Sequence, residues 1–97
     1  MYVHPEDRIY PRSRLTLNEV VYNGGEAHGA LAIGLWDGNR HLLMCWNGGN
    51  TWPKGYPVGR AGPGWYVVPP EFVPPLLTVL DPVLRQHVRD FLRIAAQ

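Results

Sequence analysis

The sequence predicts an α+β domain in which a four-stranded, mainly antiparallel sheet is followed by a short and a longer C-terminal helix. The first part of the chain contains apolar segments of strand length, separated by Asn-Gly-Gly and Asp-Gly turn signals. The last part repeats apolar residues at three- and four-residue spacing after an Asp-Pro pair, which is typical of a capped helix. A chain of 97 residues has the length of one domain, so we expect residues 1–97 to fold as a single unit.

Four segments are predicted to be strands: residues 15–22, 27–36, 40–46 and 65–68. They follow an extended polar arm, residues 1–14, in which a short strand is expected around residues 8–10. The prolines and scattered charges of this arm fit neither a strand period nor a helix period.

The turn at Asp37-Gly38 fixes the register of the second and third strands. These two residues favour the positive φ angles of a two-residue hairpin loop, so Trp36 is expected to pair with Asn39. Counting back along the strands places Ile33 opposite Leu42. One face of the sheet then carries the large apolar side chains and is expected to be the core. Its residues are Leu31, Ile33, Leu35, Leu42 and Met44.

The opposite face of the same strands is also apolar but nearly flat, because most of its side chains are small. An antiparallel sheet with one face in water normally carries polar residues there. We therefore expect this face to be covered, either by the C-terminal helix or by the same sheet of a second subunit. From this face and from the large number of aromatic residues we expect a homodimer or a higher oligomer. The expected interface residues are Ala30, Ala32, Gly34 and Leu43.

Residues 47–64 form a long loop rich in glycine and proline, which is uncommon in a compact domain unless the loop is functional or mobile. Its glycines do not follow a phosphate-binding or dinucleotide-binding motif. No acidic residue lies between Gly38 and Pro70, whereas aromatic and basic residues alternate there. Aromatic faces and cations together suit a ring and a phosphate or carboxylate. The predicted ligand-binding residues are Arg40, Trp52, Lys54, Tyr56 and Arg60. Alternatively, Trp46 and Trp65 are core residues and the cations are solvated.

The C-terminal part is predicted to be helical, with a short helix over residues 74–80 and a longer one over residues 81–96. Asp81 is placed to cap the second helix, and Pro82 is tolerated in its first turn. The apolar stripe of this helix comprises Leu84, Val88, Phe91, Leu92 and Ala95. A row of Arg85, Arg89 and Arg93 lies on another face. Such a row either binds nucleic-acid phosphates or is solvated.

No motif in the sequence indicates catalysis, a cofactor or a metal centre. Cys45 is the only cysteine and lies in an apolar strand, where a packed thiol is expected rather than a nucleophile. The histidines and carboxylates lack metal-ligand spacing and form no acid/base pair. The net charge of +1 gives no general attraction to nucleic acid or membrane, and no apolar stretch has the length of a membrane span or the pattern of a signal peptide. We therefore expect a cytoplasmic protein without a bound cofactor or metal.

Several motifs resemble those of a group of small bacterial proteins. They are WDG at residues 36–38, LMCWNG at 43–48, GYPVGR at 55–60 and WYVVP at 65–69. Their spacing is similar to that in the uncharacterised short reading frames carried by integron gene cassettes and other mobile elements, over residues 20–80. The resemblance implies a bacterial setting and a stand-alone protein, and it implies no activity.

The sequence leaves four functional interpretations. The leading one is a non-enzymatic binding module whose loop holds a small anionic or aromatic ligand or a partner protein. Trp52 and Tyr56 would stack on this ligand, while Lys54 and Arg60 would pair with its negative charge. The second is a nucleic-acid-binding protein, which would show steep salt dependence. The third is an enzyme whose site forms across a dimer, and the fourth is a structural role through self-association.

Overall fold

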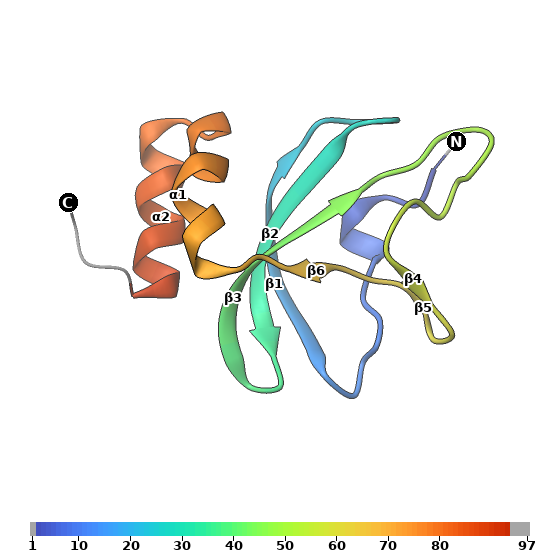
Figure 1. Ribbon diagram of the computed structural model, residues 1–97, viewed down its shortest axis with the longest axis horizontal. Helices are drawn as coiled ribbons and strands as arrows, with labels where there is room; N and C mark the ends of the chain where they lie inside the picture. The colour runs from blue at the N-terminus through green and yellow to red at the C-terminus, as the bar shows by residue number, and fades with distance from the viewer. Residues whose placement is uncertain (1, 94–97) are drawn as a thin grey trace.

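The computed structural model describes residues 2–93, which form a four-stranded antiparallel sheet followed by helices (Figure 1). The strand order is β1-β2-β3-β6, formed by Leu15–Asn23, Gly29–Trp36, Asn39–Trp46 and Tyr66–Val67. A separate two-stranded hairpin in the connection from β3 to β6 consists of β4 (Val58–Gly59) and β5 (Gly62–Pro63). The helices are α1 (Val73–Leu76) and α2 (Pro82–Leu92), with short 3-10 turns at Pro5–Asp7, Pro70–Phe72 and Leu77–Val79. The predicted α+β class is confirmed.

The β2–β3 hairpin has the predicted register, with Ile33 opposite Leu42. Asp37 and Gly38 adopt φ angles of 53° and 83°. Positive φ at both central residues is the geometry of a type I′ turn, whose twist matches that of the flanking strands. Arg14, the residue before β1, supports this turn, because its guanidinium donates to both carboxylate oxygens of Asp37 at 3.0 and 2.6 Å.

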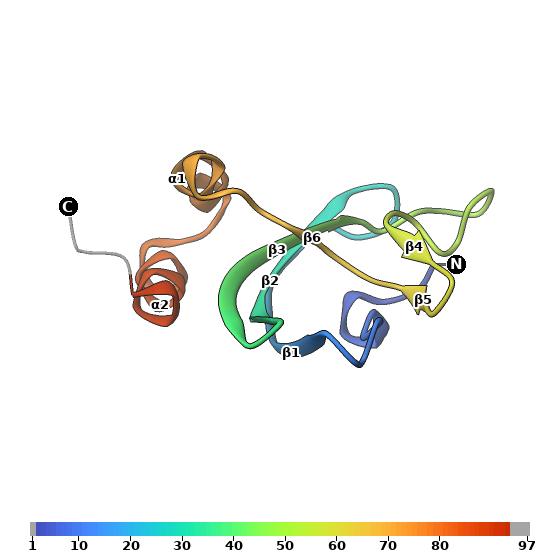
Figure 2. The ribbon, with the colours of Figure 1, turned by 60° about the horizontal axis from the view of Figure 1, so that its bottom comes forward.

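The sheet lies between two layers of the chain (Figures 1 and 2). Helices α1 and α2 lie on one side of it, and the N-terminal arm with the β4–β5 hairpin lies on the other. The helix side contains the predicted core residues Leu31, Ile33 and Leu42, packed against Leu77 and Val88 of the helical segment. The side chains that alternate with them face the second layer, so both faces of the sheet are buried over much of their area.

The C-terminal helices begin where the proline residues predict. The segment predicted over residues 74–80 is present as α1 followed by the 3-10 turn Leu77–Val79. At α2, the Asp81 carboxylate accepts a hydrogen bond from the Leu84 N–H at 2.9 Å, and Pro82 occupies the first turn. The helix ends at Leu92, short of the predicted residue 96, because Arg93 has a left-handed φ of 61°. Ala95 of the predicted stripe lies outside the described residues.

The flat second face of the sheet is covered by the chain itself, which corrects both expected covers. Ala30, Ala32 and Leu43 expose 2%, 0% and 0% of their surface, and Gly34 is buried as well. Trp65, which precedes β6 and is 4% exposed, belongs to the same apolar cluster. The small side chains of β2 leave the space that this indole needs in a close-packed interior. The four expected interface residues therefore have almost no surface available to a second subunit.

The N-terminal arm contains no strand at residues 8–10, in contrast to the prediction. It forms the turn Pro5–Asp7 and then contacts β5, where the Tyr10 N–H donates to the Pro63 carbonyl at 3.2 Å. This part of the arm is thus attached to the β4–β5 hairpin, whereas its last residue, Arg14, bonds to Asp37 in the turn between β2 and β3.

Candidate binding pocket

Arg8 attaches the arm to the loop 47–64. Its side chain is fully buried, and its three guanidinium nitrogens donate to the carbonyl oxygens of Lys54, Pro57 and Gly64 at 2.5, 2.8 and 2.9 Å. The Trp65 indole N–H donates in turn to the Arg8 carbonyl at 2.6 Å. Burial lowers the pKa of Arg8 from its ordinary value, but a guanidinium keeps its proton inside proteins, so these hydrogen bonds are charge-assisted.

A second buried polar side chain, Asn47, holds the start of the loop. Asn47 is 0% exposed, and its amide nitrogen donates to Asn23 Oδ1 at 2.9 Å and to the Gly25 carbonyl at 2.8 Å. Next to Asn47, Trp46 at the end of β3 exchanges backbone hydrogen bonds of 2.9 and 3.0 Å with Tyr56 of the loop. The long loop is therefore a series of hydrogen-bonded turns, whose start is held by Asn47 and whose end is held by Arg8 of the arm.

Gly62 allows the β4–β5 hairpin to lie directly against the arm. Its φ of 134° is a conformation that other residues rarely adopt, and a Cβ at this position would lie 2.7 Å from the Tyr10 ring. At Gly64, a Cβ would collide with the backbone carbonyl of Tyr10. These glycines are therefore required for close packing of two chain segments rather than for cradling a phosphate.

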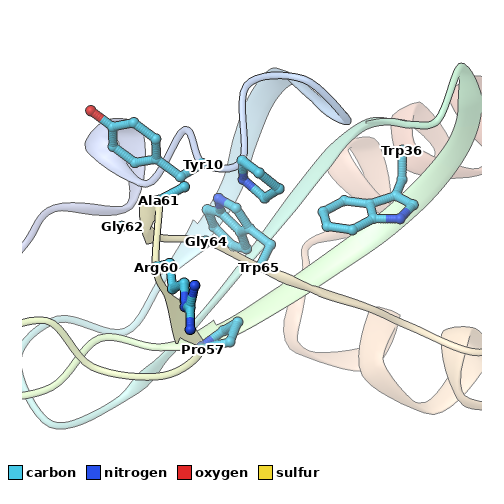
Figure 3. A pocket seen from close by; sticks show the side chains of 10 residues that line it. Tyr10, Trp36, Pro57, Arg60, Ala61, Gly62, Gly64 and Trp65 are labelled. Carbon is cyan, nitrogen blue, oxygen red and sulfur yellow. The ribbon is translucent and has the colours of Figure 1, made fainter.

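An open pocket of about 270 Å³ lies between the arm, the end of β2 and the β4–β5 hairpin (Figure 3). Pro11, Trp36 and Trp65 line it with apolar surface, and Arg60 brings a guanidinium from the hairpin. Figure 3 shows Trp36, Trp65 and Arg60 around one hollow, whereas the Tyr10 hydroxyl points away from it. Trp65 is held by its bond to Arg8, so this wall is formed before any ligand arrives.

Arg60 is the cation best placed to meet a ligand here. Within residues 2–93, its guanidinium makes no hydrogen bond or ion pair. Two more guanidinium groups lie over aromatic residues of the pocket wall. The Arg14 Cζ is 5.0 Å from the centroid of a Trp36 ring, and the Arg12 Cζ is 5.6 Å from that of Tyr10. Arg14 is already paired with a carboxylate, so Arg60 and Arg12 are the groups that favour an anion.

The structure distributes the five predicted ligand-binding residues over three places. Trp52 and Tyr56 lie together, with ring centroids 6.0 Å apart, and Lys54 lies beside Trp52. Arg60 lies in the pocket, which is on the opposite face of the sheet from the Trp46–Tyr56 pair. Arg40 is bound elsewhere, because its guanidinium donates to a carbonyl of α2 at 3.0 Å.

Sequence reasoning did not select the residues that form most of the pocket. The sequence predicts that Tyr10 and Pro11 lie in an extended polar arm and that Trp36 and Trp65 lie in strands. One signal in the sequence does point to this region, since Arg8 and Arg12 each lie two residues from Tyr10 and an aromatic residue is a common partner for a guanidinium. That signal gives no information about the contact with the hairpin.

The helix arginines do not form one free row. Arg85 turns inward and donates to the carbonyls of Leu77 and Leu80 at 3.2 and 2.9 Å, and Arg93 lies beyond the end of α2.

Cys45 is 2% exposed, and burial raises the pKa of its thiol to about 11. Among residues 2–93, no cluster of three His, Cys, Asp or Glu side chains is arranged to hold a metal ion.

Comparisons of the chain with protein-family models, with curated proteins and with solved structures gave no match. In the part of the chain that the structure describes, no helix has the length and apolar character needed to cross a membrane.

Proposed function

We propose that this protein is a non-enzymatic binding module whose pocket holds a ligand with a flat apolar ring and a neighbouring anionic group. The observation that carries the proposal is the combination in one preformed hollow of the Trp36 and Trp65 indoles with Arg60, which has no partner within residues 2–93. Ligand sites typically combine apolar walls with a small number of placed polar groups.

The walls and the cation make separable contributions to affinity. A ring stacked on an indole contributes about 1–3 kcal/mol. A hydrogen bond to a charged group contributes about 1.5–3 kcal/mol. Because Arg8 already holds the arm and the loop together, the protein loses little conformational entropy when a ligand binds. The affinity for a small probe should therefore depend on both the ring and the charge.

Two features support a binding role over a catalytic one. The Cys45 thiol is protonated at neutral pH, since burial raises its pKa to about 11, and it is shielded from solvent. The pocket itself is lined by apolar and cationic side chains and contains no carboxylate or imidazole that could exchange a proton with a ligand.

The test uses 2-naphthoate and its uncharged amide, 2-naphthamide, as matched probes. Indole N–H resonances are followed by NMR during titration of the full chain. We expect 2-naphthoate to shift the signals of Trp36 and Trp65 and to leave that of Trp52 unchanged. Replacing Arg60 with Gln should weaken naphthoate binding about tenfold or more, which corresponds to the loss of a charged hydrogen bond, and should leave naphthamide binding unchanged.

Two results would contradict the proposal. One is equal binding of the acid and the amide to the wild-type protein, which would remove the role of Arg60. The other is a shift confined to Trp52, which would place the site on the other face of the sheet. A Lys54→Gln variant is the matched control, because Lys54 carries the same charge but lies beside Trp52, outside the pocket.

A further inference from the structure

A second aromatic surface lies on the sheet face that carries the helices, beyond the area that they cover. Its first row crosses the whole sheet, because Tyr22 pairs with Leu31, Leu31 with Met44, and Met44 with Tyr66. Directly paired residues of neighbouring strands place their side chains on the same face. Leu31 is buried, whereas the other three members of the row are exposed.

A second row continues this surface toward the loop. Trp46 lies two residues beyond Met44 on β3, and it forms a bridge with Tyr56. The rings of Trp46 and Tyr56 are stacked with centroids 5.6 Å apart, and Tyr56 stacks in turn on Trp52 at 6.0 Å. The two rows together are called the aromatic face. Its members are Tyr22, Met44, Trp46, Trp52, Tyr56 and Tyr66.

All six of these side chains are exposed. Each exposes between 37% and 52% of its surface, with Tyr66 the most exposed. A further hollow of about 150 Å³ lies where Tyr22 and Met44 meet Val79 of the helical segment, and its lining is apolar. The stacked rings are already ordered by their contacts with one another, so a partner would bury them at a small entropic cost.

The area of the aromatic face approaches that of a stable interface between two copies. At about 150–250 Å² per aromatic side chain, the exposed fractions amount to on the order of 450 Å² for the five rings. Met44 and Val79, which are 38% and 53% exposed, enlarge this patch. Two copies that face each other would therefore bury a total of on the order of 1,000 Å² or more, once the residues around each patch are included. This area reaches the lower range of specific protein interfaces.

We propose that the aromatic face binds a second copy of this chain in a two-fold symmetric homodimer. None of its six side chains carries a charge, so two copies meet without bringing like charges together. Lys54 lies at the rim of this face beside Trp52, whereas Arg40 is bonded to α2 and Arg60 lies in the pocket, so the cations that a nucleic acid would require are not gathered here. In a two-fold dimer both subunits contribute the same patch, which suits a surface that is apolar throughout.

This dimer uses a different face from the ligand pocket and does not depend on the proposed function. The pocket lies on the layer formed by the arm and the β4–β5 hairpin, whereas the aromatic face lies on the layer that contains the helices. A subunit should therefore bind 2-naphthoate equally well as a monomer and within a dimer, which allows the two proposals to fail separately.

The test is sedimentation equilibrium of the full chain, compared with a Tyr66→Glu variant. We expect the wild-type protein to be a dimer, and we expect Tyr66→Glu to raise the dimer dissociation constant about a hundredfold or more, as loss of an interface hot spot does. Val83→Glu is the matched control, because Val83 is 80% exposed on α2 and lies outside the aromatic face. This control should remain a dimer, and Tyr66→Glu should still bind 2-naphthoate as the wild type does.

A measurement on the wild-type protein keeps the test decisive if Tyr66→Glu does not fold. In an equal mixture of isotope-labelled and unlabelled chains, filtered NOE spectra should show contacts from the Met44 methyl group of one chain to aromatic protons of the other. A wild-type chain that stays monomeric at millimolar concentration would overturn the proposal and leave the face to a different partner. A dimer that Tyr66→Glu leaves intact would overturn it equally.

Discussion

The replacement of Arg8 by Met tests whether the buried guanidinium holds the arm and the loop together. Arg8→Met keeps most of the apolar stem but removes the donors that now reach the carbonyls of Lys54, Pro57 and Gly64. Each buried carbonyl left without a donor costs about 1–3 kcal/mol. Water entry recovers part of this cost, and the charge no longer has to be desolvated, so we expect a net loss of about 3–5 kcal/mol.

The assay is urea unfolding followed by both tryptophan fluorescence and far-UV circular dichroism. A domain of this kind has a free energy of unfolding of about 5–15 kcal/mol, so the variant should still fold but with a clearly lower midpoint. Arg12→Met is the matched control in the same arm, because Arg12 is exposed and its described contact is the Tyr10 ring at 5.6 Å. It should change stability by about 0.5 kcal/mol or less. If Arg8→Met lost less than about 1 kcal/mol, the three hydrogen bonds would not be what holds the loop.

Two further predictions concern titratable groups. Cys45 should react slowly with a disulfide reagent at mildly alkaline pH in the native protein and rapidly in concentrated urea, because burial raises the pKa of its thiol to about 11; equal rates would show that the thiol is accessible. The hydrogen bond from Arg14 lowers the pKa of Asp37 below its ordinary value of 3.8. The pair therefore stabilises the fold above that value and loses its effect as the pH falls through the lowered pKa. The difference in unfolding free energy between wild type and Asp37→Asn, measured by urea unfolding, should disappear as the pH falls through the lowered pKa of Asp37. A difference that stays constant with pH would assign the effect of Asp37 to the turn backbone instead of to the ion pair.

Local turn chemistry made much of the fold predictable. The register of β2 and β3 follows from Asp37-Gly38 alone, and the start of α2 follows from Asp81-Pro82, because both pairs restrict the backbone within a few residues. The cover of the flat face was not predictable in this way. It includes Trp65, which is held by Arg8 from a position 57 residues earlier in the chain.

The difference between local and long-range contacts also explains how much of the site could be predicted. Aromatic and basic composition predicts a ligand-binding role for the loop 47–64, but composition carries no information about which face each residue occupies. Tyr56 pairs with Trp46 on one face, and the chain then turns so that Arg60 lies on the other. Residues adjacent in sequence thus belong to two different surfaces, and only the long-range contacts of Arg8 and Tyr10 reveal the pocket.

The Arg8 contacts also constrain the order in which the molecule matures during synthesis. The arm leaves the ribosome well before Lys54, Pro57 and Gly64, so its guanidinium has to remain hydrated while the β1–β3 meander closes through contacts that are nearer in sequence. Docking of the arm, and with it completion of the pocket, is therefore a late event of translation. Until then the alanine-rich face of the nascent sheet stays open, and a chaperone that binds apolar surface would find it there.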